Sequence, residues 1–229
     1  MTTRILILSA ALLAGGCAGH HMHAAETQAR ADAEAAMHDS MHAADDADPY
    51  AGMSDEERAA MEAMMMQWEA HMTPGPHHAH MARRVGTWNS DFTWWHVPGG
   101  PGESASGVTT VRPILNGLFV QEETTSDTMI PGHAFHGIGI NGWDNTAEKL
   151  VMLWIDNAGS GMYYAEGGCN ADCSEQVTEG YGTDMMSGTT KRYRYVTKDG
   201  GADAATFEMW VQGDDGEFWK MMECRYTRR

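Results

Sequence analysis

The fold is decided by an alternation that begins at Val85 and continues to the C-terminus. Residues 85–97 read VGTWNSDFTWWHV, and apolar and polar side chains alternate through the centre of this stretch. A period of two is typical of β-strands with one buried face. Gly, Pro, Asn and Asp clusters separate this stretch from nine similar ones, at 105–112, 117–126, 134–142, 149–157, 161–168, 175–183, 189–197, 204–212 and 217–227. About ten short, evenly spaced strands predict an all-β, single up-and-down antiparallel barrel without exposed edges.

One helix is expected before the barrel. Ser54-Asp-Glu-Glu57 has the form of a capping box, in which a hydroxyl and an acid three residues later satisfy the first backbone amides. The helix is expected to run to about His71 and to end at Thr73-Pro-Gly-Pro76. Its apolar residues recur at spacings of three and four, a stripe that predicts packing on the barrel: Met61, Met64, Met65, Trp68 and Met72.

The N-terminus indicates export. Residues 1–17 read MTTRILILSAALLAGGC, with one positive charge, a short apolar run and small residues before Cys17, as in a secretory signal peptide. Leu13-Ala-Gly-Gly-Cys17 resembles the lipobox of bacterial lipoproteins, although the leucine lies one place further upstream than usual. The alternative is a secreted protein with an unmodified Cys17. We expect a lipid-anchored protein of the cell envelope, on the periplasmic face of the outer membrane.

The domain organisation follows from composition. A signal peptide (1–16) precedes a lipidated, flexible His/Met-rich stalk (17–53), a helix with a Pro-Gly turn (54–84) and the barrel (85–229). The stalk lacks the Val, Ile, Leu and Phe that a core needs. The formal net charge is −17, which argues against nucleic acid as a partner because phosphates need Lys and Arg for neutralisation.

Several motifs resemble one bacterial family. Gly86-Thr-Trp88 looks like the opening motif of calycin, or lipocalin-like, barrels. A longer ordered set is similar to domain-of-unknown-function family 1579 over roughly residues 54–229: Pro74-Gly-Pro-His-His78, Gly117-Leu-Phe-Val-Gln-Glu122, the segment 135–145, the segment 154–161, Phe207-Glu-Met209 and the segment 221–226. The resemblance implies a calycin-like barrel and carries no established activity. The Cys169–Cys173 loop is not part of that pattern.

A candidate ligand site lies in the strands. Trp154 and Asp156 share one face of a strand, and the turn that follows would bring Asp156 to the barrel mouth. Two alternatives stay open: Asp156 caps the Gly-rich turn, or the charged strand residues form the solvent face. The candidate ligand-binding residues are Trp154, Asp156, His136, Tyr163, Glu122, Glu208 and Glu223.

Histidines and methionines form candidate metal ligands. On a helix, His38 and His42 would share a face, and imidazole with thioether favours copper, with zinc as a second choice. The alternative is a His-rich tract without a defined site. The candidates are His38, His42, Met37, Met41, His77, His78 and His80.

The remaining cysteines have separate expected roles. In an oxidising compartment Cys169 and Cys173 are expected to form a disulfide, worth about 2 kcal/mol on the chain-entropy model. Cys224 alternates with apolar residues and is interpreted as a buried free thiol.

The sequence contains no serine-hydrolase elbow, phosphate loop, dinucleotide fingerprint or HExxH helix, which favours a binding protein over the common enzymes. The first hypothesis is a barrel that binds a small apolar or amphipathic ligand. The second is copper or zinc binding by the stalk. The third is an enzyme that uses buried carboxylates, Asp156 with Glu208 or Glu223.

Overall fold

The computed structural model describes residue 32 and residues 50–130, 132–184 and 187–229. The expected signal peptide, Cys17, and the candidate ligands Met37, His38, Met41 and His42 lie outside these residues. The chain divides into two compact units, Met1–Glu62 and Ala63–Arg229. The helices are α2 (Asp55–Met72) and α3 (Pro76–Ala82), with one 3-10 turn, η1 (Leu115–Gly117). The strands are β1 (Gly86–Trp94), β2 (Glu103–Ile114), β3 (Phe119–Ile130), β4 (His133–Asp144), β5 (Lys149–Asp156), β6 (Tyr163–Cys169), β7 (Glu175–Thr183), β8 (Thr190–Asp199), β9 (Ala204–Gln212) and β10 (Phe218–Arg228).

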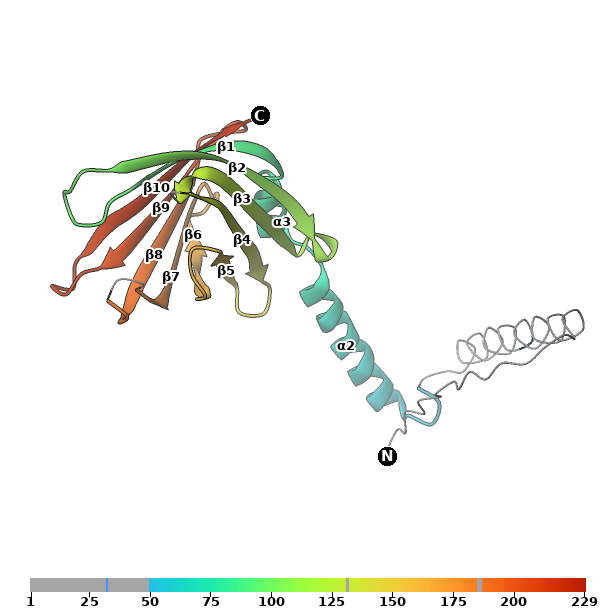
Figure 1. The fold of residues 1–229 in the computed structure, drawn as a ribbon. Coiled ribbons are helices and arrows are strands. Elements are labelled where there is room, and N and C mark those ends of the chain that lie inside the picture. The colour runs from blue at the N-terminus through green and yellow to red at the C-terminus, as the bar shows by residue number, and fades with distance from the viewer. Residues whose placement is uncertain (1–31, 33–49, 131, 185–186) are drawn as a thin grey trace, which may run out of the picture. The chain divides into compact units, whose positions relative to one another are not determined.

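The ten strands close into one antiparallel barrel (Figure 1). Each strand pairs with its neighbours in sequence, and β1 pairs with β10 to complete the ring. The all-β, up-and-down barrel predicted from the alternation is therefore confirmed. No helix in the described part of the chain has both the length and the apolarity needed to cross a bilayer.

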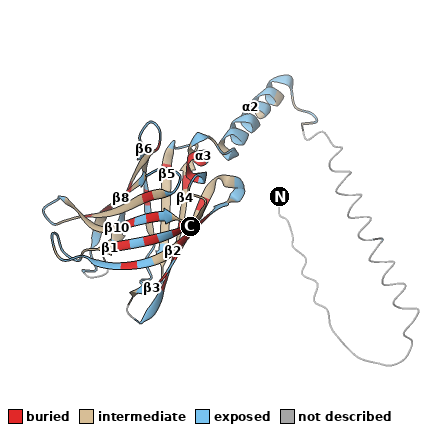
Figure 2. Ribbon diagram, turned by 90° about the horizontal axis from the view of Figure 1, so that it is seen from above, coloured by how far each residue is buried: buried red, intermediate tan, exposed pale blue. Residues whose placement is uncertain are grey.

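Strand alternation separates the barrel interior from its surface. On β1, Trp88, Ser90 and Phe92 are buried, whereas Asn89 and Asp91 are exposed. The register places these buried residues opposite others of the same face, such as Ser90 opposite Tyr226. Buried positions therefore recur at alternate residues along the strands (Figure 2). Away from the register shifts near Ser126 in β3 and Met222 in β10, this parity assigns strand residues to the inside or the outside.

The capping box at the start of α2 is confirmed. The backbone amide of Ser54 donates to Glu57 Oε2 (2.8 Å), and the amide of Glu57 donates to Ser54 Oγ (3.3 Å). The hydrogen bonds that the Ser54 amide and hydroxyl donate to the carboxylate lower the pKa of Glu57. The helix ends at Met72, one residue beyond the expected end and before Thr73-Pro.

The expectation that the methionine stripe packs on the barrel is wrong. No residue of α2 is buried; Met64 is 53% exposed and Trp68 is 55% exposed. The N-terminal helix that packs against the barrel is α3, which lies within the segment expected to be a Pro-Gly turn. His78, His80 and Met81 of α3 are buried, and the helix contacts β3 and β4. Pro76 fits the first helical position because its missing amide has no helical partner there.

The chain beyond α3 is fastened to the end of β10. The Arg228 guanidinium donates from Nη2 to the carbonyl of Arg83 (2.8 Å) and from Nη1 to the carbonyl of Val85 (2.9 Å). The same guanidinium lies 4.1 Å from the ring centroid of Trp88. The Trp88 indole N–H donates to the carbonyl of Arg84 (2.9 Å). These contacts fix where α3 and Arg84 enter the barrel.

Two glycines allow β6 and β7 to approach closely. A Cβ added at Gly180 would lie 2.0 Å from the Tyr164 carbonyl oxygen, and one added at Gly167 would lie 2.0 Å from the Val177 carbonyl oxygen. Both distances are far below van der Waals contact, so the backbone would have to move. By contrast, a Cβ at Gly168 would meet nothing within 4 Å.

We predict that Gly180→Ala lowers the free energy of unfolding by about 1–3 kcal/mol because the added methyl group overpacks the strand pair. The matched control, Gly168→Ala, should change it by less than about 0.5 kcal/mol. Urea unfolding followed by tryptophan fluorescence measures both. Equal effects of the two substitutions would contradict this account of the close approach.

Candidate ligand-binding interior

A row of hydroxyl groups crosses the interior between β1, β2 and β3. Ser90 Oγ lies 2.6 Å from Thr109 Oγ1, and Thr109 Oγ1 lies 2.9 Å from Thr124 Oγ1. All three side chains are fully buried, with exposures of 0%, 0% and 1%. Each hydroxyl can donate one hydrogen bond and accept more, so the row satisfies itself and still presents acceptors to the lumen.

A charged cluster lies beside this row. Arg84 follows α3, and its guanidinium carbon is 5.0 Å from the ring centroid of Tyr226. The Tyr226 hydroxyl donates to Glu122 Oε1 (3.2 Å). Burial lowers the pKa of Arg84, but the nearby Glu122, Tyr226 and Asp199 outweigh it, so the pKa is raised. Burial also raises the pKa of Tyr226 well above its usual value. Arg84 therefore stays charged and Tyr226 neutral.

Part of the Arg84 guanidinium lacks a protein partner. Nε and Nη2 are both inaccessible to solvent, and neither donates to any atom in the described part of the chain. Other atoms of Arg84 are exposed, and the residue as a whole is only partly buried. Buried donors in native proteins are nearly always satisfied. The cluster therefore offers two hydrogen-bond donors to a molecule inside the barrel.

Aromatic rings line the next part of the interior. Tyr163 meets Tyr193 edge-on with centroids 6.0 Å apart, and Tyr193 stacks on Tyr195 at 6.3 Å. Tyr195 in turn stacks on Phe207 at 6.0 Å. Burial, with Asp184 and Tyr163 nearby, raises the pKa of Tyr193 to about 12. This run spans β6, β8 and β9 and forms a continuous apolar wall.

Trp154 and Asp156 lie on the inward face of β5, beside Tyr163 of β6. A Cβ at Gly137 would lie 2.3 Å from the Trp154 ring, so the glycine makes room for the indole. The Trp154 N–H donates to Asp156 Oδ2 (2.7 Å), and the backbone amide of Ala158 donates to Asp156 Oδ1 (2.9 Å). Asp156 therefore caps the Gly-rich turn, one of the two roles left open by the sequence.

The other candidate residues are divided between the two faces. Glu122 faces inward, as described above. His136 faces outward, with Nε2 2.8 Å from Glu123 Oε1, so it does not meet Asp156 and Tyr163 inside the barrel. Glu208 and Glu223 also face outward, and both bind Lys220, at 2.9 Å and 2.6 Å.

This arrangement does not assemble the carboxylate pair that the enzyme hypothesis needs. Asp156 lies on the inner face of β5, whereas Glu208 and Glu223 lie on the outer faces of β9 and β10. Lys220 lowers the pKa of Glu223, against a smaller opposing effect of burial. A carboxyl group with a lowered pKa is a poor general acid at neutral pH.

The interior is filled at one end and accessible at the other. At the α3 end, a cavity of about 30 Å³ is lined by residues that include Met81, Leu150 and Tyr195, which is room for about two waters. Further from α3, inward side chains are partly exposed to solvent, and three of them are flexible methionines. These side chains are Trp154, Tyr163, Met209, Trp219, Met221 and Met222.

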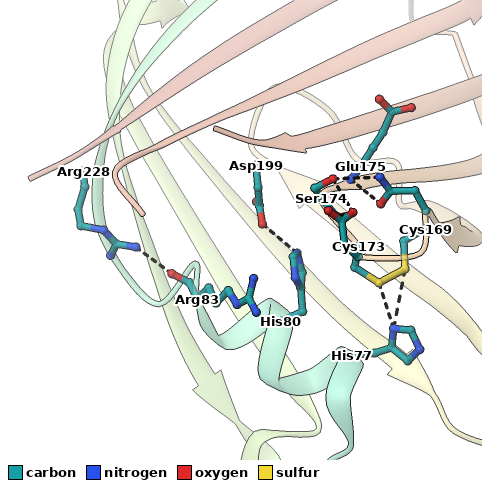
Figure 3. Close-up of polar contacts among 11 residues, drawn as sticks. His77, His80, Arg83, Cys169, Cys173, Ser174, Glu175, Asp199 and Arg228 are labelled. Carbon is teal, nitrogen blue, oxygen red and sulfur yellow. Dashed lines mark hydrogen bonds and ion pairs between the residues drawn. A yellow bond between two sulfur atoms is a disulfide. The ribbon is translucent and has the colours of Figure 1, made fainter. Parts of the chain in front are cut away.

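The three histidines of α3 have different surroundings, and Figure 3 shows two of them, His77 and His80. His77 Nδ1 lies 3.2 Å from Cys173 Sγ. His78 Nδ1 accepts a hydrogen bond from the Gly75 amide (2.9 Å), and burial lowers the pKa of His78. His80 Nε2 lies 2.9 Å from Asp199 Oδ2. Although adjacent in sequence, they do not point at one common centre.

A family model described as "Protein of unknown function (DUF1579)" matches residues 73–228. The chain belongs to this family. No curated protein matches it. Among solved structures, the chain is similar to Rv2717c from M. tuberculosis, with 10% identity and a TM-score of 0.49, over 69% of this chain and 99% of that one. It is also similar to a redesigned beta barrel, with 11% identity and a TM-score of 0.34, over 65% of this chain and 93% of the design.

Arg84, Tyr226 and the hydroxyl row were not among the residues predicted from the sequence. Tyr226 and Ser90 occupy alternating strand positions, so correct phasing of β1 and β10 would have identified them as inward. Arg84 lies between a short helix and the first strand, where no periodicity indicates its direction.

We predict a pH dependence for Tyr193. Below pH 10 the phenol is protonated in both the folded and the unfolded chain. Between pH 10 and 12 the unfolded chain loses this proton first, since the folded pKa is raised to about 12, and the free energy of unfolding falls as pH rises. Tyr193→Phe removes this contribution, so its stability should decline less steeply from pH 10 to 12 in urea titrations. A decline identical to that of the wild type would contradict the assignment.

Proposed function

We propose that the barrel binds a small amphipathic ligand that enters from the end opposite α3. The observation that carries this proposal is the Arg84 guanidinium, which lies inside the barrel with Nε and Nη2 unpartnered among the described residues. The polar end of the ligand would accept hydrogen bonds from these atoms. Its apolar part would lie against the aromatic wall formed by Tyr163, Tyr193, Tyr195 and Phe207.

The charge balance favours a neutral polar group on the ligand. Glu122 already attracts the Arg84 guanidinium, and Asp199 adds a second negative group nearby. An anionic ligand would bring a further negative charge into the interior, where an uncompensated charge costs several kcal/mol. A carbonyl, amide or hydroxyl oxygen would meet the two donors without this cost. We therefore expect neutral amides, esters or alcohols to bind more tightly than the matching carboxylates.

Flexible side chains would allow the ligand to enter. The described interior cavity is far smaller than the roughly 300 Å³ of a typical ligand pocket. Met152, Met209 and Met222 face inward and are partly exposed. Unbranched methionine side chains change rotamer easily and adapt to different shapes. Their rearrangement would create the space for the apolar part.

The test is displacement of an environment-sensitive hydrophobic dye from the full chain by long-chain amides and by the matching carboxylates. We predict that Arg84→Met weakens amide binding by about 10- to 100-fold, the equivalent of a charge-assisted hydrogen bond. The matched control is Arg192→Met, because Arg192 lies on the outer surface and pairs with Glu179. This control should leave the dissociation constant unchanged.

A second variant guards against loss of folding. Arg84→Met leaves Glu122 uncompensated, so the double variant Arg84→Met/Glu122→Gln keeps the interior neutral and should fold but still bind weakly. Failure of every amphipathic compound to displace the dye from the wild type would overturn the proposal. Equal amide affinity of the Arg84→Met and Arg192→Met variants would also overturn the proposal.

We further propose that the protein is exported and held at a membrane of the cell envelope through Cys17. The support is the sequence of residues 1–17, in which an apolar run and two glycines precede this cysteine. Several acyl chains on one cysteine would give a nearly permanent anchor, at about 0.8 kcal/mol for each buried methylene. Copper or zinc binding by the stalk remains the alternative function.

The anchor predicts where the protein fractionates. In envelope preparations the wild type should sediment with membranes, and Cys17→Ser should move it to the soluble fraction. Cys224→Ala is the control, because Cys224 is buried in the barrel, and it should stay with the membranes. Membrane association of the Cys17→Ser protein would rule out this anchor.

A further inference from the structure

A histidine and two cysteines meet at the end of the barrel that α3 covers. His77 comes from the start of α3, Cys169 ends β6, and Cys173 lies in the loop that leads to β7. His77 Nδ1 is 3.2 Å from Cys173 Sγ and 3.8 Å from Cys169 Sγ, and the two cysteines are joined by a disulfide (Figure 3). One ligand atom from each residue lies within 4.8 Å of the others. In the described part of the chain, no other such group of His, Cys, Asp or Glu is found.

The surroundings hold these side chains in place. The His77 ring stacks on Trp143 with centroids 3.6 Å apart and an angle of 20° between the planes. The backbone amide of Cys173 donates to the carbonyl of Asn170 (2.9 Å), and the amide of Asn170 donates to the carbonyl of Glu175 (3.0 Å). The loop that carries Cys173 is therefore tied to the start of β7. The His77 ring lies against Trp143 with Nδ1 directed towards the two sulfur atoms.

We propose that His77, Cys169 and Cys173 form a redox-gated site for a thiophilic d¹⁰ cation, Cu⁺ or Zn²⁺. The disulfide state provides no thiolate and is closed to the metal. A dithiol opens the site: one of its thiolates attacks a protein sulfur, and a mixed disulfide forms. Its second thiol then releases the protein sulfur. Two electrons and two protons pass to the protein, giving two thiols, and the dithiol leaves as a cyclic disulfide. The cation replaces the two thiol protons and binds both Sγ atoms and His77 Nδ1.

The ligand set explains the choice of metal. Thiolate is a soft ligand that selects Cu⁺ and Zn²⁺, and imidazole suits both metals. Two thiolates and one imidazole complete a three-coordinate site for Cu⁺. Zn²⁺ prefers four ligands, so water would fill its fourth position. His78 and His80 are not included, since His78 is bonded to Gly75 and His80 is paired with Asp199.

This site is separate from the proposed ligand site. It uses none of the interior residues Arg84, Glu122 or Tyr226. It also differs from the copper or zinc site expected from the sequence, which combined His77 with His78 and His80 and included no cysteine. A failure to bind metal would therefore not contradict the ligand proposal, and a failure to bind the amphipathic ligand would not contradict the metal site.

The test compares oxidised and reduced full-length chain. One sample is reduced with a dithiol, which is then removed under argon, and the other is left oxidised. Both are titrated with Cu⁺ and, separately, with Zn²⁺ against a chromogenic chelator. We predict that the reduced chain binds one more equivalent of at least one cation than the oxidised chain, with a sulfur-to-copper charge-transfer band in the Cu⁺ arm. Equal binding by both samples in both arms would overturn the proposal.

Variants assign the ligands. Cys173→Ser should abolish the extra equivalent. His77→Ala should lower the metal affinity by at least about tenfold, because even substitutions of residues that only orient the ligands have an effect of this size. The matched controls are Cys17→Ser and the exposed His133→Ala, which should bind as the wild type does. The comparison of oxidised and reduced wild type needs no substitution, so it tests the proposal even if a variant does not fold. Retention of the extra equivalent by Cys173→Ser would overturn the proposal.

Discussion

The hydrogen bonds of Arg228 and Trp88 to the carbonyl groups of residues 83–85 fix the chain at one end of the barrel. These three carbonyls follow a seven-residue helix whose own hydrogen bonds are few. Charged donors make stronger hydrogen bonds than neutral ones, and the Arg228 guanidinium also lies on the Trp88 ring. As a consequence, α3 covers this end, Arg84 points into the interior, and His77 reaches the cysteine loop. Both candidate sites depend on this attachment, together with the packing of α3 on β3 and β4.

The interior combines polar and apolar parts in a way that suits recognition better than stability. A fully apolar interior would avoid the cost of burying Arg84 and Glu122, since replacing buried ion pairs with well-packed apolar residues is often stabilising. Instead, the hydroxyls of the row bond to one another and Tyr226 donates to Glu122, whereas two nitrogens of Arg84 have no partner among the described residues. Beside them the aromatic wall and the methionines provide a surface without hydrogen-bonding requirements. The proposed amphipathic ligand would match both parts.

The fold was predictable because period two is preserved through most of the ten strands. Glycine and proline clusters also marked the turns, and β2 and β3 extend only a few residues beyond the expected limits. It was harder to predict which side chains point into the barrel and which point outward. On β10 the register shifts between Lys220 and Met222, so Phe218 lies against Arg194 on the outer face while Cys224 is buried inside. The meeting of His77 with Cys173 joins residues 96 apart in sequence, and no local pattern encodes such a contact. The exposed α2 stripe shows that spacings of three and four alone do not ensure burial.

Native-state amide hydrogen exchange tests the attachment of α3 most directly. Residues 79–85 donate their amides within a short helix and turn that could not persist alone, because isolated helices of this length are unstable in water. If α3 is seated as described, these amides should exchange nearly as slowly as those of β3 and β4, and much more slowly than those of the exposed helix α2. Exchange of residues 79–85 as fast as that of α2 would contradict the account, since Arg84 and His77 would then have no fixed position.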